Sequence, residues 1–389
     1  MPGPAARNWW NDERGRAVLY QAALLSGVIA LVWFLVSNTL QNLESQNIAT
    51  GFKFLEREAS FGISESVVEY SPTDSYLRAL WVGLLNTLKI AGVGIVLCTI
   101  LGFLIGIARL SSNWLVSRLA GVYVEALRNV PVLLQLFLWY ALITEVFPAA
   151  RDALSCFDLV FLSNRGLKIP APIWNETAIA ILIAFFAAIV LSFVMAVWAR
   201  KRLDKTGKPF PVFTASCAFF VVLPFVAWLA GGADIEMSVP ALKGFNFVGG
   251  YTITPEFFAL LLGLVLYTGA FVGEIVRAGV LAVPHGQTEA AMALNLPRGL
   301  ILKLVILPQS LRVAVPPLTS QYLNLTKNST LAVAIGYPDM VSVGNTAVNQ
   351  TGQAVECIAI IMAAYLTISL VMSFFMNWFN ARVALTGGR

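Results

Sequence analysis

Long apolar runs constrain this chain more than any other feature. The first extends from about Ala17 to Val36 and is long enough to cross the roughly 30 Å core of a bilayer as a helix. No small-x-small cleavage site follows it, so we expect an uncleaved first span. Further runs lie at about Leu80–Ala108, Leu119–Phe147, Thr177–Trp198, Phe210–Ala230 and Pro255–Val283, from near Leu311, and at Ala354–Phe379. With 58% hydrophobic and 12% charged residues, the sequence predicts an all-α membrane protein of about eight spanning helices.

The charge pattern indicates a direction across the membrane. The loop between the fourth and fifth runs is rich in basic residues, and Lys and Arg concentrate in the loops on this side, as is typical of the cytoplasm. The basic residues of this loop are Arg200, Lys201, Arg202, Lys205 and Lys208. An even number of spans then predicts that both termini are cytoplasmic. The net charge of +5 does not indicate nucleic acid as a partner, because the basic residues lie in short loops between apolar runs.

A polar island, residues 284–308, interrupts the apolar runs on the cytoplasmic side. Residues Gln287 to Leu294 favour a helix, and Asn295 is one of the few residues other than glycine that tolerate the left-handed turn ending a helix. We expect a second short helix, Gly299 to Leu307, to stop at Pro308. Small side chains in the first helix would let a partner approach its backbone, so the segment favours protein docking.

The order of residues in this island resembles the EAA loop of ABC importer membrane subunits. The match comprises the triplet Glu289, Ala290 and Ala291, a turn residue, and a terminal apolar segment with Leu-Pro. Asn295 stands where the family usually has Gly, and Val305 where it usually has Ile. The resemblance implies that the island docks on an ATP-hydrolysing subunit. The residues expected to dock are Gly286, Glu289, Ala290, Ala291, Asn295, Leu307 and Pro308.

Two longer stretches narrow the resemblance to the polar amino acid subfamily. They are VEALRNVPVLLQL and LPQSLRVAVPPLTSQYLNLTKNSTL, and the whole layout is similar to the larger permease of the general L-amino acid type. This resemblance implies a type I permease core carrying an inserted helix pair. It also implies a bacterial inner membrane location, a second permease subunit as a heterodimer partner, two ATPase subunits and a periplasmic amino acid binding protein. The regions are 1–79 (first span and outer loop), 80–147 (core), 148–254 (insertion, expected to be peripheral) and 255–389 (core).

Polar residues within the spans are candidates for a translocation path. They are Glu125, Arg128, Gln135, Asn324, Lys327 and Asn328. Charges in lipid are costly, so Glu125 and Arg128 either pair with each other or line the path. Glu274 and Arg277 repeat this spacing in the sixth span and favour an ion pair. Lys327 is the leading candidate for the substrate carboxylate, and a snorkelling membrane anchor is the alternative. Helix packing is the alternative for Gln135.

Catalytic and cofactor motifs do not point to an enzyme. His285 is the only histidine, the four cysteines lack metal-site spacing, and no G-x-x-x-x-G-K-[ST] phosphate loop occurs. We therefore expect a transport subunit without a cofactor, with ATP bound by its partner. A secondary transporter or channel for small polar solutes would also explain the polar seventh span. The residues leave open which amino acids pass, which permease holds the substrate, and whether the permease pair is a homodimer or a heterodimer.

Overall fold

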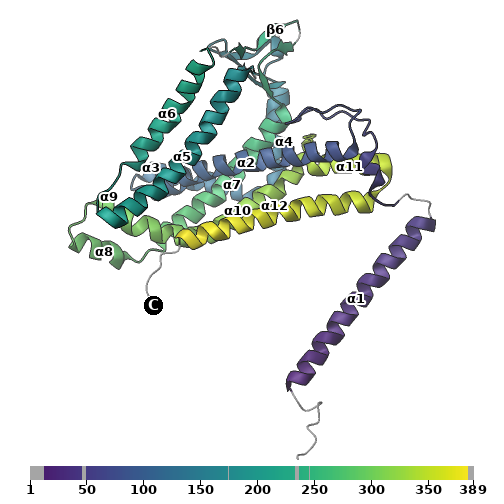
Figure 1. Cartoon of the computed structure of the whole chain (residues 1–389), viewed down its shortest axis with the longest axis horizontal. Coiled ribbons are helices and arrows are strands. Elements are labelled where there is room, and N and C mark those ends of the chain that lie inside the picture. Colours follow the sequence, from purple (N-terminus) through teal and green to yellow (C-terminus); the bar gives the residue numbers. More distant parts are fainter. Residues whose placement is uncertain (1–12, 46–49, 174, 233–235, 245, 384–389) are drawn as a thin grey trace, which may run out of the picture. The chain divides into compact units, whose positions relative to one another are not determined.

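The computed structural model describes residues 13–45, 50–173, 175–232, 236–244 and 246–383, most of them in helices (Figure 1). The helices are α1 (Glu13–Ser45), α2 (Tyr76–Arg109), α3 (Trp114–Asn129), α4 (Val132–Ala141), α5 (Glu176–Thr206), α6 (Val212–Ala230), α7 (Pro255–Leu281), α8 (His285–Ala293), α9 (Arg298–Ile301), α10 (Leu307–Asn328), α11 (Met340–Thr351) and α12 (Ala354–Val383). The described residues form two compact units. One comprises the chain up to Leu88 with Pro338–Phe375, and the other comprises Lys89–Tyr337 with the chain from Met376 onward.

Seven described helices are long and apolar enough to cross a membrane. They correspond to seven of the predicted runs, so the prediction of an all-α multi-span protein is confirmed. Helix α1 runs further than its apolar core, to Ser45. The seventh span also begins earlier than expected, because a continuous helical segment extends from Arg298 to Ile335.

The third predicted run is bent by 104° between α3 and α4 and is not one straight helix. Pro131 causes the break, because it lacks an N–H and forces the preceding residue out of the helical conformation. Val130 accordingly has φ −102° and ψ 130°. The amide of Gln135 stabilises the bend by donating to the carbonyls of Leu127 at 2.8 Å and Val130 at 2.9 Å. If this bent pair counts as one span, the spans reach the predicted eight.

The segment after α1 packs through two of its aromatic residues, Phe54 and Phe61. Phe54 lies in a 3-10 helix, Phe52–Glu56, and is completely buried against Tyr76 of α2. Phe61 packs on the same tyrosine with ring centroids 6.2 Å apart, whereas Phe52 is exposed. The resulting core of this unit includes residues of α2, α11 and α12.

Helix α11 is an element that the sequence reading missed. Asp339 caps its N-terminus by accepting the Ser342 N–H at 2.9 Å, and the Tyr365 hydroxyl donates to the other carboxylate oxygen at 3.2 Å. Asp339 is completely buried, and this burial raises the pKa of its carboxyl to about 6.

Helices α2 and α7 approach closely through glycines. A Cβ on Gly102 would lie 2.4 Å from a Val272 methyl, and one on Gly106 would lie 2.8 Å from the Gly273 carbonyl oxygen. Small residues therefore do allow close helix packing at Gly102 and Gly106. Gly92 has no neighbour of this kind, because a Cβ there would meet nothing within 4 Å.

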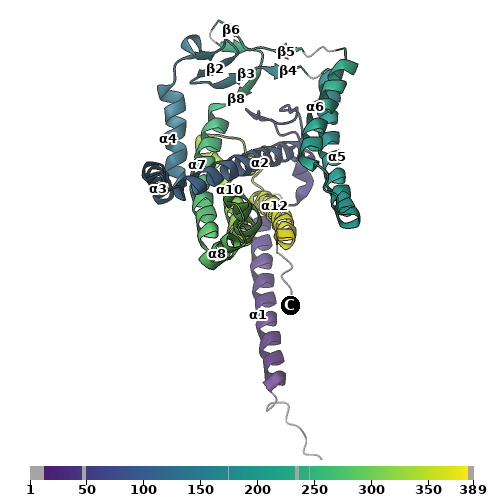
Figure 2. The ribbon, with the colours of Figure 1, turned by 90° about the vertical axis from the view of Figure 1, so that its left-hand side faces the viewer.

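The insertion contains short strands as well as two helices. The strands are β1 (Leu154–Cys156), β2 (Val160–Ser163), β3 (Gly166–Ile169), β4 (Ala171–Pro172), β5 (Met237–Ser238), β6 (Ala241–Lys243), β7 (Asn246–Val248) and β8 (Tyr251–Ile253). A four-stranded sheet has the order β1-β2-β3-β8, with every pair antiparallel (Figure 2). The sequence does not predict these strands, because runs of two to four residues show no readable alternation.

Helices α5 and α6 form an antiparallel hairpin within the insertion (Figure 1). Asn175 caps α5 through the Ala178 N–H, and Gly207 ends it in the left-handed conformation, at φ 66°. Phe185 of α5 and Phe220 of α6 pack together with ring centroids 5.5 Å apart, and Trp198 of α5 packs on Phe210 of the connecting loop at 5.3 Å. Both predicted spans of the insertion are thus present.

Candidate functional site

The polar island begins with helix α8, which ends as its residues predicted. Asn295 has a φ of 54°, in the left-handed region. The Asn295 N–H donates to the Met292 carbonyl at 2.8 Å, and the Leu296 N–H donates to the Ala291 carbonyl at 3.2 Å. These two bonds are the Schellman pattern, which satisfies carbonyls that a helix C-terminus leaves free. Asparagine therefore performs here the role that glycine usually has.

The second half of the island differs from the prediction. The helix does not stop at Pro308 but continues from α9 through a π turn, Leu302–Ile306, into α10. The wider π turn ends two residues before Pro308, and such bulges accommodate a residue that cannot complete the regular i to i−4 pattern. Pro308 thus lies at the start of α10. Pro308 does not end the helix here, because the backbone widens into a π turn just before the proline.

The expected docking residues form an exposed surface on α8 and the following turn. Gly286, Glu289, Ala290 and Asn295 are exposed, and so is the adjacent Leu294, at 76%. Ala291 points inward and is only 4% exposed. The His285 imidazole lies 3.5 Å from the Glu289 carboxylate, one turn along the same surface. Further along the chain, Leu307 is exposed and Pro308 is half-buried. The island therefore offers an apolar and polar surface that a partner can cover.

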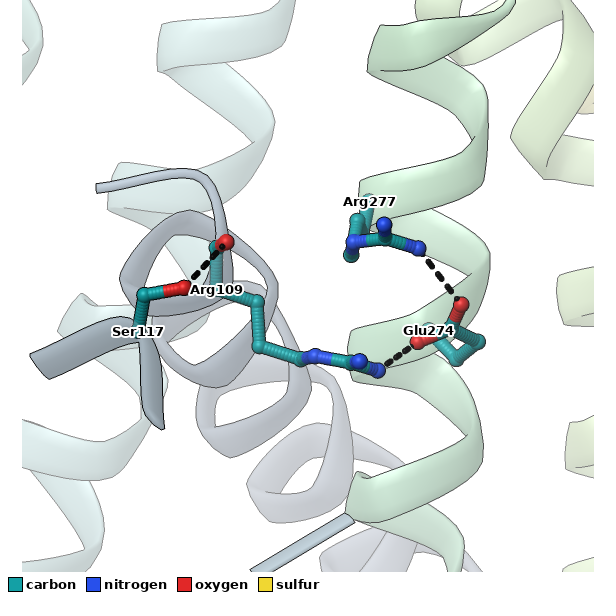
Figure 3. A network of polar contacts seen from close by, with 4 residues as sticks. All are labelled: Arg109, Ser117, Glu274 and Arg277. Atoms are coloured by element: carbon teal, nitrogen blue, oxygen red, sulfur yellow. Dashed lines mark hydrogen bonds and ion pairs between the residues drawn. The ribbon is translucent and has the colours of Figure 1, made fainter. Parts of the chain in front are cut away.

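An ion network lies about two turns before the end of α7, close in sequence to this island (Figure 3). Glu274 accepts from Arg277 at 2.9 Å, and its other carboxylate oxygen pairs with Arg109 at the end of α2. The Ser117 hydroxyl of α3 donates to the Arg109 carbonyl at 3.1 Å. The predicted Glu274–Arg277 pair is confirmed. Arg109 is a partner that sequence spacing could not reveal, because it comes from another helix.

The expected pair between Glu125 and Arg128 is not formed. Both side chains are exposed on α3, and no ion pair joins them in the described part of the chain. The Arg128 guanidinium instead lies 4.9 Å from the ring centroid of Phe271 on α7. Gln135 is only 3% exposed, and its amide nitrogen serves the bend between α3 and α4. In the described chain, the side chains of Glu125 and Gln135 therefore make no hydrogen bond or ion pair with α10.

Helix α10 has one exposed face, which is apolar in its first half and polar from Ser320 onward. Its exposed positions recur every three or four residues, which is the repeat of a single helix face. We call this the α10 stripe: Val313, Pro316, Pro317, Ser320, Asn324 and Lys327. Asn328 is half-buried beside it, and the opposite face buries Ala314, Leu318 and Leu325. The stripe thus unites Asn324 and Lys327 on one surface.

Some polar residues of α10 are satisfied within the helix. The Thr319 hydroxyl donates to the Val315 carbonyl at 3.0 Å, and the buried Thr326 hydroxyl donates to the Tyr322 carbonyl at 3.0 Å. In contrast, no carboxylate pairs with Lys327 among the residues that the structure describes. The polar side chains of this helix that need a partner from outside it therefore lie on the α10 stripe.

Comparison with known proteins places the chain among transport components. Residues 188–385 match the family model described as "Binding-protein-dependent transport system inner membrane component". The chain is 46% identical to the General L-amino acid transport system permease protein AapQ of Rhizobium johnstonii, over 98% of this chain and 96% of that protein. It is 48% identical to the Putative amino-acid ABC transporter permease protein YhdX of Escherichia coli, over 95% and 94%.

A third relative is also a transport system permease protein and also matches over nearly its whole length. The chain is 39% identical to the Glutamate/glutamine/aspartate/asparagine transport system permease protein BztB of Rhodobacter capsulatus, over 96% of this chain and 95% of that protein. These matches cover nearly the whole length on both sides, so they include the insertion as well as the core. An importer subunit, and not the alternative of an independent carrier or channel, therefore accounts for the exposed island between two spans. The chain belongs to the binding-protein-dependent transport system inner membrane components, the permease family of ABC importers.

Proposed function

We propose that the chain is the permease subunit of an ATP-driven importer that carries L-amino acids across a bacterial inner membrane. The observation that carries this proposal is α8, an exposed, Schellman-terminated helix between spanning helices α7 and α10. The names of the three relatives support amino acids as the substrate class. The complete importer would contain a second permease subunit, two ATPase subunits and a periplasmic binding protein. ATP would be bound by the ATPase subunits.

The exposed face of α8 is the proposed docking site for the ATPase. Ala290 is exposed while Ala291 is buried. A substitution at position 290 should therefore affect docking, whereas one at position 291 should also affect folding. Ala290→Arg should leave the protein inserted and reduce ATP-driven uptake in proteoliposomes at least about tenfold, because the long side chain prevents close approach of the partner. Lys205→Ala changes an exposed residue of another proposed cytoplasmic loop and is the matched control. Wild-type uptake and normal ATPase co-purification in the Ala290 variant would refute this assignment.

The α10 stripe is the proposed wall of the translocation path. Asparagine, serine and a lysine cannot be satisfied by lipid tails, so this face requires a polar cavity or a protein neighbour. A second permease subunit contributing a similar face would enclose such a cavity. Lys327 supplies a fixed cation for the carboxylate that all amino acids share, and Asn324 and Asn328 supply neutral hydrogen-bonding groups.

Replacement of Lys327 tests the path directly. Lys327→Met should lower uptake of every amino acid in a panel by a similar factor, while the ATPase remains bound. Lys243→Met removes an exposed lysine from an outer hairpin and is the control. If Lys327 serves only as a membrane anchor, uptake by the variant will equal that of the wild type. A loss confined to acidic amino acids would also contradict the proposed role.

The proposed orientation puts α8 and the α5–α6 loop in the cytoplasm, together with both termini, which lie outside the described residues. The insertion's helices are proposed to be peripheral to the path, because none of the described α6 residues is buried. A cysteine at position 205 should react with membrane-impermeant reagents only from the cytoplasmic side. The native Cys156 and Cys217 are exposed and need replacement first. Labelling of position 205 from outside would overturn this topology.

A further inference from the structure

The hairpin of β1 and β2 ends in a turn with an unusual backbone. Phe157 and Asp158 have φ angles of 53° and 54°, a region that side chains larger than glycine seldom adopt. Hairpin turns with two positive φ angles usually contain Asn-Gly or Asp-Gly. The Phe157 side chain is also 92% exposed. The chain therefore holds a large aromatic group in solvent, at a position where glycine or asparagine would be less strained.

This hairpin tip has the composition of a small protein-binding surface. Leu154 and Leu159, on either side of the turn, are exposed apolar residues. Arg151, Asp152 and Asp158 are exposed around them. An apolar centre with an aromatic anchor and a charged rim is typical of protein interfaces. The charged rim disfavours insertion of the same tip into lipid, because desolvating carboxylates is costly.

The tip is joined to strand β8 through β3, which pairs with β2 on one side and with β8 on the other. Phe161 of β2 also packs on Phe247 of β7, with ring centroids 4.7 Å apart. Strand β3 approaches β8 so closely that a Cβ on Gly166 would lie 2.1 Å from the Ile253 carbonyl oxygen. The Lys168 ammonium, buried in the sheet, donates to the Thr252 hydroxyl. These contacts leave little freedom for the hairpin to move independently of β8.

Strand β8 is in turn attached to two spanning helices. The Lys89 ammonium of α2 donates to the Tyr251 hydroxyl of β8 at 2.8 Å. The same ammonium lies 4.2 Å from the ring centroid of Phe257, in the first turn of α7. Thr254 follows β8 and caps α7 by accepting the Phe257 N–H at 3.1 Å. A displacement of the hairpin would therefore also displace β8, and through β8 the contacts with α2 and with the first turn of α7.

The order of elements determines on which side the hairpin lies. Strand β8 leads directly into one end of α7, and the other end of α7 leads into α8. Because α7 is long enough to span the membrane, the sheet and α8 lie on opposite sides. If α8 meets the ATPase in the cytoplasm, the hairpin faces the outside. The soluble partner that a binding-protein-dependent transporter meets on that side is the binding protein.

We propose that the β1–β2 hairpin is a docking point for the amino acid binding protein, with Phe157 as its aromatic anchor. This inference rests on the proposed function. The strained turn presents the ring to the partner, the charged rim surrounds the contact, and the attachment through Lys89 connects the docked protein to α2 and α7.

The test measures ATP hydrolysis by the complete reconstituted importer as loaded binding protein is added. Phe157→Ala should raise the binding-protein concentration for half-maximal stimulation about tenfold, with the maximal rate unchanged, because truncation of an aromatic anchor weakens binding without altering the coupling steps. Leu242→Ala, on the second outer hairpin, is the control because Leu242 is exposed at 45%. Asp158→Gly retains the ring, relaxes the turn and should leave the half-maximal concentration within about threefold of wild type.

The possible failures can be distinguished. Absence of stimulation in the wild-type complex would contradict the proposed function itself. Normal stimulation of the wild type with an identical curve for Phe157→Ala would overturn only the docking inference. A photo-crosslinking phenylalanine analogue at position 157 should form an adduct with the binding protein, and an adduct with the second permease or with lipid would overturn it as well.

Discussion

Two Glu-x-x-Arg segments of this chain have the same spacing and different structures. On α7, Glu274 holds Arg277 at 2.9 Å and also pairs with Arg109 of α2. On α3, Glu125 and Arg128 are exposed, and Arg128 lies over Phe271. Spacing places the two charges of each segment on one helix face. A neighbouring helix decides whether they pair, since α2 brings a third charge to Glu274 and α7 offers an aromatic ring to Arg128.

The close crossing of α2 and α7 is what delivers Arg109 to Glu274. Gly102→Leu would place side-chain atoms where Val272 already lies, because even the Cβ would be 2.4 Å from a Val272 methyl carbon. We expect a loss of more than about 3 kcal/mol of stability and removal of the Arg109 contact, because neither helix can yield without separating. Thermal unfolding of the purified protein measures this loss. Gly92→Leu is the control, since a Cβ there meets nothing within 4 Å, and equal losses in both variants would contradict the packing.

Removing Glu274 breaks the network without disturbing the crossing. Glu274→Ala leaves two partly buried arginines without their shared carboxylate, and we expect it to cost about 2–3 kcal/mol, reduced from the value for a fully buried pair by the partial exposure of all three groups. Glu125→Ala should change stability by less than about 0.5 kcal/mol, since its carboxylate pairs with no cation in the described chain. Unfolding of both variants in one detergent compares them, and similar losses would remove the distinction between the two segments.

Asp339 is a carboxylate of a third kind: it is buried, and its hydrogen-bond partners are backbone N–H groups and a tyrosine hydroxyl instead of a cation. Its pKa is raised from 3.8 to about 6, so the folded state binds the proton more tightly than the unfolded state. Stability should therefore fall as pH rises from about 4 to about 6, by about 3 kcal/mol at most, and should be constant above that range. Asp339→Asn keeps an acceptor for the Ser342 N–H and should abolish this slope. A slope unchanged in the variant would assign the pH dependence to another group.

A small effect is expected from replacing Arg128. Arg128→Gln removes the stacking on Phe271 and should cost about 0.5–1 kcal/mol, the usual value for an exposed cation–π contact. A Glu125→Gln variant in the Arg128→Gln background should add nothing further, which a double-mutant cycle of unfolding measurements checks. A coupling above about 0.5 kcal/mol between the two positions would reveal an ion pair and make the two segments alike.

Local features of the island could be read from the sequence because they depend on neighbouring residues. The left-handed Asn295 and the end of α8 follow from side-chain and backbone preferences within one turn. The stop expected at Pro308 was wrong, because a π turn in the preceding residues accommodates the proline. The exposed face of α10 and the inward position of Ala291 do not follow in this way, because Ser310 and Thr326 of α10 are buried although they are polar.

The sequence alone determined the positions of the apolar runs, the position of the polar island and which charged residues share a helix face. These depend on hydrophobicity over a run of residues and on spacing within a helix, which the chain order contains. Only the tertiary structure decided that Arg109 joins Glu274, that Gln135 holds the bend between α3 and α4, and that Lys89 ties β8 to α7. Those contacts join residues up to 165 positions apart. Their formation depends on how closely helices cross and which rotamers fit, and no local pattern records either.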